Sequence, residues 1–322
     1  MDFTFPEKPR VAIIGAGALG GYFGLRLALA GADVAFLMRS DAAAVREKGL
    51  RVEMADGDVH SLPQPRVCED VREIGPCDLV LIALKATNNP LLKVFLPPLL
   101  HEHTCLLTVQ NGMGNTDFLR KVCPHHPVVA GLCQIGVNRV RAGFIRNSVP
   151  SGGFVLLAAA DEAAPHSLPE AIAACLRSAG IDTRLAASLE DALWRKLMWN
   201  VPFNGLTILT GGAGGTETVL KTETLRAYAR ALMEEVRLAA GAVGTRIEPE
   251  YTDKLLAFSD KLGQYEPSSL VDFRAGRAVE VEAIFGEPLR RGEAAGVAMP
   301  YLRSLYWLLK GIADPPLAPA DS

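Results

Sequence analysis

The sequence predicts an α/β fold class: a doubly wound, mostly parallel sheet at the amino end, followed by a second, all-helical domain. Three observations predict it. A glycine-rich turn joins a short apolar run to a helical run near the start of the chain. Similar apolar runs recur up to about Ala187, as in a sheet buried on both faces. From Ser188 onward the apolar residues follow a helical period. We therefore expect one domain over residues 1–187 and a second over 188–322.

The composition is that of an ordinary globular protein whose partner is a small molecule. The 322 residues are 49% apolar and 21% charged, with a net charge of -3. The sequence has no run of basic residues of the kind that binds nucleic acid or an anionic membrane surface. The start lacks the pattern of a secretory signal, and no apolar run is long enough to cross a membrane. We expect a cytoplasmic protein.

Cysteine and histidine spacing argues against a metal site or a disulfide framework. The six cysteines are scattered with no CxxC pair, so we expect them to be reduced and mostly buried. The histidines near His101 and His125 lie in turn-like sequence, which favours surface roles over metal ligation.

The first fold unit is a strand, a tight turn and a helix. Val11–Ile14 is the apolar run of a buried strand, and a GxGxxG motif follows it directly. In such a Rossmann-type unit the first glycine allows the turn, the second lets backbone amides approach a pyrophosphate, and the third lets the helix pack closely. The helix is expected to stop near Gly31. The predicted dinucleotide-binding residues are Gly15, Ala16, Gly17, Ala18, Leu19 and Gly20.

The next predicted strand, Asp33–Met38, indicates which dinucleotide binds. An NAD site usually places an acid at this strand end to hold the ribose 2′-hydroxyl, but here the strand runs into Arg39. An arginine suits a 2′-phosphate, so NADP(H) is the favoured cofactor. The alternative is a solvated Arg39, which the neighbouring acid Asp41 keeps open.

The middle of the chain predicts a mixture of strands and helices. Asp56-Gly57 between two apolar segments of residues 50–59 indicates a hairpin or loop excursion. Later strands, the last of them antiparallel through short turns, are followed by one more helix. The predicted helices are 42–48, 91–100 and 170–179, and the predicted strands are 128–137, 143–149 and 152–158.

Two further strands end in polar residues. Lys85 follows the strand 78–84, and Asn111 follows the strand 104–109. Ligands of an open parallel sheet lie outside the carboxyl ends of its strands, so both side chains are candidates for the site. Asn111-Gly112 is also a common turn dipeptide, and a turn is compatible with a ligand role.

The second domain begins with a segment that carries polar residues at helical spacing. Lys196, Asn200 and Asn204 are four residues apart and share one helix face, among bulky apolar neighbours. The apolar neighbours favour a cleft-facing stripe over a solvent-facing one. Pro202 predicts that the helix bends or ends early. Long helices are expected at 218–241, 250–263 and 300–312, and a disordered Pro-rich tail at 314–322.

At this point the chain resembles the ketopantoate reductase family (2-dehydropantoate 2-reductases), which pairs a Rossmann domain with a helical domain. The resemblance covers nearly the whole chain. It is specific because of the order and spacing of its motifs rather than the glycines alone. The matching residues are Gly15 to Gly20, Arg39, Leu84-Lys85-Ala86, Asn111 to Gly114, Leu193 to Leu197 with Asn200 and Asn204, Pro267-Ser268 through Asp272, and Gly276-Arg277 to Glu280.

The resemblance implies roles for these residues. Lys196 would be the general acid and Glu280 its partner, near both cofactor and substrate; Lys85 and Asn111 would lie near the cofactor. Asn111 is also expected at the substrate, together with Asn200, Asn204 and Ser268. A lysine with an ordinary pKa of about 10.4 is protonated at neutral pH, so it can stabilise a developing alkoxide and protonate it without a metal. From the residues alone, Ser268 could merely cap a helix and Glu280 could be a surface charge.

The implied reaction is NADPH-dependent reduction of 2-dehydropantoate to (R)-pantoate, a step towards pantothenate and coenzyme A. The chain departs from the family pattern at Ser269 and Val271, at Phe285, and in the loop 211–215, which lacks an asparagine. Another 2-keto acid therefore stays open as the substrate, and a non-catalytic NADP(H) sensor is the rival of a different class. A homodimer and a monomer are both compatible with the helical second domain.

Overall fold

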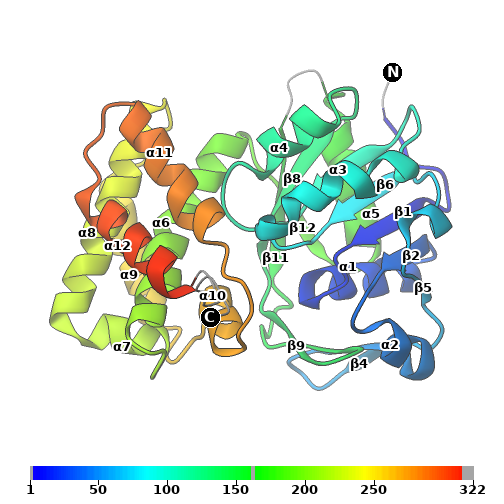
Figure 1. The fold of residues 1–322 in the computed structure, drawn as a ribbon, viewed down its shortest axis with the longest axis horizontal. Coiled ribbons are helices and arrows are strands. Elements are labelled where there is room, and N and C mark those ends of the chain that lie inside the picture. Colours follow the sequence, from blue (N-terminus) through cyan, green and yellow to red (C-terminus); the bar gives the residue numbers. More distant parts are fainter. Residues whose placement is uncertain (1–2, 161–163, 314–322) are drawn as a thin grey trace, which may run out of the picture. The chain divides into compact units, whose positions relative to one another are not determined.

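The computed structural model describes residues 3–160 and 164–313, and the predicted disordered tail at 314–322 lies outside them. The chain divides into two compact units (Figure 1). Unit 1 consists of Met1–Gln110 and Asn115–Leu189, and unit 2 of Asn111–Gly114 and Glu190–Ser322. The segment Asn111–Gly114 therefore belongs to unit 2, although unit 1 precedes and follows it in the chain.

Unit 1 is built on an eight-stranded sheet in the order β12-β11-β8-β7-β6-β1-β2-β5. The strands from β8 to β5 pair in parallel, whereas β11 is antiparallel to β8. This confirms the predicted N-terminal parallel sheet. Its strands are β1 (Arg10–Ile14), β2 (Asp33–Leu37), β5 (Arg66–Cys68), β6 (Leu79–Ile82), β7 (Cys105–Thr108), β8 (Val128–Gln134), β11 (Phe154–Ala159) and β12 (Asp182–Leu185).

Helices cover both faces of this sheet because successive strand residues point to opposite faces. In β1, Val11 and Ile13 pack with residues of α1 and α5, while Ala12 and Ile14 pack with residues of α3 and α4. All four side chains are fully buried, as the apolar run predicts. The helices are α1 (Ala18–Leu29), α2 (Ala42–Lys48), α3 (Leu92–Phe95), α4 (Asn115–Val122) and α5 (Leu168–Ser178), with short 3₁₀ turns at Val71–Glu73, Ala86–Leu91 and Pro97–Leu99.

The strand order reverses between β1 and β6. The chain proceeds from β1 outward through β2 to β5, then returns to β6 on the other side of β1 and continues through β7 to β8. At such a switch point the loops after the two central strands diverge and leave room for a ligand. Here those loops begin at Gly15 and at Ala83, whose amide donates to the Ile14 carbonyl at 2.8 Å.

A separate four-stranded sheet, in the order β4-β3-β10-β9, was not expected. The predicted hairpin is confirmed as the antiparallel pair of β3 (Leu50–Glu53) and β4 (Val59–Leu62). The single strand predicted over 128–137 is wrong, because β8 ends at Gln134 and β9 (Val137–Arg141) joins this second sheet. There β9 is antiparallel to β10 (Phe144–Asn147), which pairs in parallel with β3.

Unit 2 is helical, as predicted. Its central helix α6 (Leu189–Leu209) continues through Pro202, so the expectation of an early end is wrong. The single helix expected over 218–241 is also wrong, because Thr222 adopts an extended backbone that separates α7 from α8. The remaining helices are α7 (Thr216–Lys221), α8 (Glu223–Ala242), α9 (Glu250–Ser259), α10 (Ser268–Arg274), the π-helix η4 (Glu282–Gly286), α11 (Glu287–Ala294) and α12 (Pro300–Ala313).

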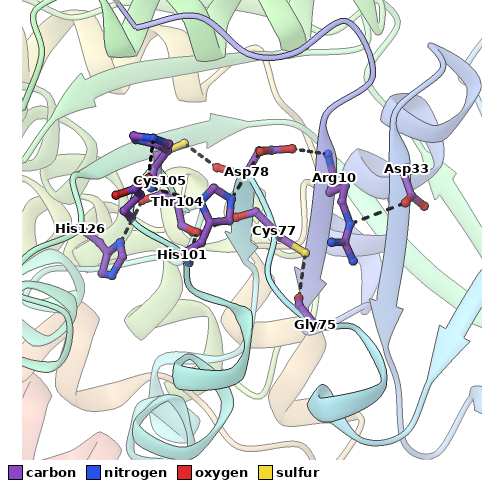
Figure 2. Close-up of polar contacts among 11 residues, drawn as sticks. Arg10, Asp33, Gly75, Cys77, Asp78, His101, Thr104, Cys105 and His126 are labelled. Carbon is purple, nitrogen blue, oxygen red and sulfur yellow. Dashed lines mark hydrogen bonds and ion pairs between the residues drawn. The ribbon is translucent and has the colours of Figure 1, made fainter.

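The amino ends of the sheet strands hold a structural polar network (Figure 2). Asp78 accepts a hydrogen bond from the Arg10 amide at 2.7 Å, and His101 Nε2 lies 3.4 Å from its other oxygen. The buried Thr104 hydroxyl donates to the Cys77 carbonyl at 2.7 Å. The histidine therefore joins strand ends together. Across the described residues, no three His, Cys, Asp or Glu side chains form a possible metal site.

The six cysteines are free, and four of them are buried, as predicted. Burial raises the pKa of the Cys77 thiol to about 11, so this group is a neutral, unreactive thiol at neutral pH. Among the described helices, none has the length and apolar character required to cross a membrane.

Candidate active site

The glycine-rich turn after β1 has the geometry that its sequence predicts. Gly15 has a φ of +95°, and a side chain there would lie 2.6 Å from the Leu84 amide nitrogen. Gly20 lies so close to the Gly15 carbonyl that a Cβ would overlap it, which holds α1 against the turn. By contrast, a Cβ on Gly17 would meet nothing within 4 Å. The turn is thus tight on its protein side and open at its middle glycine.

Arg39 lies just beyond the carboxyl end of β2, and its side chain is exposed. It forms no ion pair with any residue of the described chain, Asp41 included. The Asp41 carboxylate instead accepts a hydrogen bond from Arg139 Nη1 at 2.7 Å and one from the Ser40 hydroxyl at 3.0 Å. The acid that could neutralise Arg39 is therefore engaged elsewhere.

Lys85 lies beyond the carboxyl end of β6, as predicted. It adopts an extended backbone and precedes the 3₁₀ turn Ala86–Leu91, and its side chain is half-buried. Beside it, the amide of Gln110 donates to the Leu84 carbonyl at 2.9 Å and to Asn89 at 2.7 Å. These bonds tie the ends of β6 and β7 together within unit 1.

In unit 2, the structure brings Lys196 and Asn111 together. Lys196 Nζ donates a hydrogen bond to Asn111 Oδ1 at 2.9 Å, across 85 residues of sequence. Both side chains are half-buried. The ammonium group is thus held at a defined position on α6 by an uncharged acceptor, so its positive charge is not neutralised by this bond.

Asn111 is positioned by a close backbone contact of its own segment. The Met113 amide donates to the Ala283 carbonyl at 2.8 Å. Gly112 has a φ of +82°, and any Cβ there would overlap the Ala283 backbone. Only glycine fits this position, because it needs both the left-handed conformation and the close approach. The Asn-Gly turn therefore also anchors the segment to η4.

Glu280 precedes that same π-helix and is only 5% exposed. The alternative that Glu280 is a surface charge is therefore wrong. Glu282, two residues later, does lie at the surface, where Arg290, Tyr306 and Lys310 bind it. Lys196 contacts the segment Asn111–Gly114 directly, through Asn111, whereas Glu280 lies three residues before Ala283, whose backbone contacts Gly112 and Met113. π-Helices of this kind are frequent at functional sites.

Asn200 and Asn204 are buried on α6, with 7% and 2% exposure, so the solvent-facing alternative is wrong for both. Their surroundings differ. No residue in the described part of the chain hydrogen-bonds the Asn200 side chain. Asn204 Oδ1 accepts from the Ser269 amide at 3.0 Å, which satisfies a free N–H in the first turn of α10.

Ser268 is the first residue of α10 and is exposed. The N-cap position of α10 is held by Pro267 rather than by Ser268, so capping does not explain this serine. Asn204, 65 positions away from Ser269, performs the capping instead. Sequence reasoning missed this second role, because the only local signal was a serine at a helix start.

Comparison with known proteins identifies the family. The model described as "Ketopantoate reductase PanE/ApbA" matches residues 11–157, and the model of its C-terminal part matches residues 188–313. The chain belongs to the ketopantoate reductase family. It is therefore an oxidoreductase of an NAD(P)-dependent reductase family, as the sequence motifs predicted.

Individual family members match over nearly their full length. The 2-dehydropantoate 2-reductase of Nostoc sp. is 35% identical over 307 residues, which cover 94% of this chain and 95% of the relative. The crystal structure of the 2-dehydropantoate 2-reductase from Geobacter metallireducens GS-15 has a TM-score of 0.88 and 37% identity, and the match covers 94% and 99% of the two chains.

The fold also occurs in an enzyme with a different name. D-Mandelate dehydrogenase, in a ternary structure with NADH and anilino(oxo)acetate, has a TM-score of 0.84 and 23% identity over 94% of this chain and 98% of that one. The shared fold therefore does not by itself select a substrate or a cofactor.

Proposed function

We propose that this ketopantoate reductase family member reduces 2-dehydropantoate to (R)-pantoate with NADPH. Residues 1–187 are the proposed NADP(H)-binding domain, and 188–322 carry the proposed proton donor. The bond from Lys196 to Asn111 is the observation that carries the proposal, because it holds the Lys196 ammonium group in a fixed position. The same face of α6 also carries Asn200. The names of the Nostoc and Geobacter relatives supply the substrate.

The residues of unit 1 fit NADP(H). The open space at Gly17 allows backbone amides to approach a pyrophosphate, and α1 begins at the next residue, with its N–H groups towards that position. Arg39 would bind the 2′-phosphate, since its guanidinium has no carboxylate partner within the described chain. The rest of the turn (Gly15, Ala16, Ala18, Leu19 and Gly20), together with Lys85, Asn111 and Glu280, completes the proposed cofactor set.

When bound, NADPH supplies a hydride to the carbonyl carbon of the 2-keto acid. Negative charge then develops on the carbonyl oxygen. The Lys196 ammonium group stabilises that charge and donates the proton that completes the alcohol. Asn111 limits the rotamers of the lysine, so less ordering is needed when substrate binds.

The proposed substrate contacts are Asn111, Asn200, Asn204 and Ser268. The Asn200 side chain is 7% exposed and hydrogen-bonds no described residue, which leaves its amide to bind substrate, and the Ser268 side chain is exposed. Asn204 uses its oxygen for α10 and keeps its amide group for substrate. Glu280 is proposed to keep Lys196 protonated through its buried negative charge.

The test is NADPH consumption by purified protein with 2-dehydropantoate and a panel of other 2-keto acids. Lys196→Ala should lower kcat by about 10²- to 10⁴-fold, the range typical of a lost general acid. Lys221→Ala removes an exposed lysine paired with Glu217 and serves as the matched control with unchanged kcat. If Lys196→Ala keeps wild-type kcat, Lys196 is not the proton donor.

The same assay separates the alternatives. Preferred turnover of a different 2-keto acid would keep the mechanism and change the substrate. Tight NADPH binding with no turnover of any keto acid would favour the sensor.

A further inference from the structure

Asp41, the acid that follows β2, has to be reconciled with a preference for NADPH. The inference drawn from it rests on the proposed NADPH-dependent function. An acid near this strand end normally accepts hydrogen bonds from the adenine ribose and favours NAD(H). Asp41 is such an acid, only two residues after Arg39. An unrestrained carboxylate here would repel a 2′-phosphate and compete for the Arg39 guanidinium.

The structure shows what restrains Asp41. Arg139 Nη1, from β9 in the four-stranded sheet, donates to Asp41 Oδ2 at 2.7 Å, and the Ser40 hydroxyl donates to Oδ1 at 3.0 Å. Both carboxylate oxygens therefore have partners. The Asp41 side chain is only 15% exposed, which makes this pair less screened than the other ion pairs of this sheet. Figure 1 shows β9 and α2, which begins directly after Asp41, at the same end of unit 1.

The charge balance at this strand end depends on Arg139. Arg39, Asp41 and Arg139 together carry a net charge of +1, which suits a 2′-phosphate of about -1.5 to -2 at neutral pH. Without Arg139 the net charge is zero, and the nearest cation available to Asp41 along the chain is Arg39 itself. Arg39 would then lose the property that fits it for phosphate, namely the lack of a carboxylate partner among the described residues.

We propose that Arg139 determines cofactor specificity by holding Asp41, so that Arg39 is left to bind the 2′-phosphate of NADPH. Arg139 is thus a positioning residue that acts through Asp41. It lies 100 residues after Arg39 in the sequence, on a strand outside the main sheet. A pattern confined to β2 and its following loop would not reveal it.

The test is the ratio of the Kd values for NADH and NADPH, measured by fluorescence titration on the intact protein. Arg39→Ala should lower this ratio by about 10- to 100-fold, as expected for loss of a charge-assisted bond to phosphate. Arg139→Ala should lower it by about 5- to 10-fold, through weaker NADPH binding. Arg146→Ala, which removes another Arg–carboxylate pair of the same sheet, with Glu53, is the matched control and should leave the ratio unchanged.

The double variant Asp41→Asn/Arg139→Ala distinguishes positioning from direct binding. Without the Asp41 charge, Arg139 is no longer needed, so the ratio should return to within about twofold of wild type. A double variant as impaired as Arg139→Ala would overturn the proposal and make Arg139 a direct phosphate ligand. If Arg39→Ala abolishes the preference for NADPH over NADH but Arg139→Ala preserves it, this inference is overturned and the proposed function is not. A wild-type protein without NADPH preference overturns the proposed cofactor, and this inference with it.

Discussion

Two asparagines on α6 show how one residue type in one helix takes different roles. Asn204 has a protein partner, the buried amide of Ser269, whereas Asn200 has none among the described residues. Loss of a helix cap costs about 0.5–2 kcal/mol, and an unsatisfied buried N–H costs about 1–3 kcal/mol. In Asn204→Ala the two costs are not additive, because both arise from loss of the single bond between the Ser269 amide and Asn204.

We therefore expect Asn204→Ala to lower the free energy of unfolding by about 1–3 kcal/mol. Asn200→Ala loses no protein hydrogen bond and should cost less than about 1 kcal/mol. Both should raise KM for the keto acid. Urea unfolding of the two variants measures the difference, and Asn204→Asp, which keeps an acceptor, is the control. Equal losses in both alanine variants would contradict the capping role.

The residue types of the site follow from sequence, but their partners do not. Arg39 and Lys196 stand out through local patterns, namely a strand end and a four-residue helical spacing. The bond between Lys196 and Asn111 spans 85 residues, and no local pattern encodes it. The 5% exposure of Glu280 likewise follows from tertiary packing, which no local pattern encodes.

At the scale of elements, the approach of the Asn111–Gly114 segment to η4 decides where Asn111 lies. Gly112 and Gly114 have nearly equal φ values, +82° and +84°, so alanine at either position bears similar backbone strain. Only Gly112 faces the Ala283 backbone; a Cβ on Gly114 would meet the Glu287 side chain at 3.5 Å. Substitutions at Gly112 and Gly114 therefore separate the effect of the close contact with Ala283 from the effect of the positive φ.

Gly112→Ala should consequently lower kcat at least tenfold more than Gly114→Ala, since a displacement of about 1 Å in a positioning group can cost about 100-fold. Steady-state kinetics with both variants, with circular dichroism as a check of folding, measures this. Similar losses in the two variants would show that the contact with Ala283 does not position Asn111.

Elements formed by local patterns were predicted well, and those that depend on distant pairing were not. The helix α2 matches its predicted range, because its period and its terminal glycine are local signals. The four-stranded sheet was missed because β3 pairs with β10, which lies about ninety residues later. The break at Thr222 interrupts a continuous helical period, so periodicity alone could not reveal it.

At the scale of the whole molecule, paired carboxylates make stability depend on pH. In Asp260, hydrogen bonds from Arg226 lower the pKa below 3.8, and the pair joins α8 to the end of α9. A carboxylate with a lowered pKa contributes stability above its unfolded pKa, and this is lost as pH falls through the folded value. Burial raises the pKa of Glu235, which acts in the opposite direction above about pH 4.5.

We expect the melting temperature of Asp260→Asn to lie slightly below that of wild type at pH 7, by the equivalent of about 0.2–1 kcal/mol for an exposed pair. The gap should close as the pH falls below 3.8 and Asp260 in the wild type becomes protonated. Thermal melts from pH 7 to pH 3 follow this. A gap that persists at the lowest pH would show that the asparagine acts through something other than lost charge.

The assignment of Asn111–Gly114 to the helical unit bears on how such enzymes can be recombined. A chimera joined at the boundary near residue 188 would take Lys196 from one parent and its acceptor Asn111, with the glycine that fits against Ala283, from the other. Exchange of the helical half between relatives therefore succeeds only when these four residues travel with it or already match. The Lys196–Asn111 pair, which contains the proposed proton donor, is thus encoded by two separate stretches of the gene.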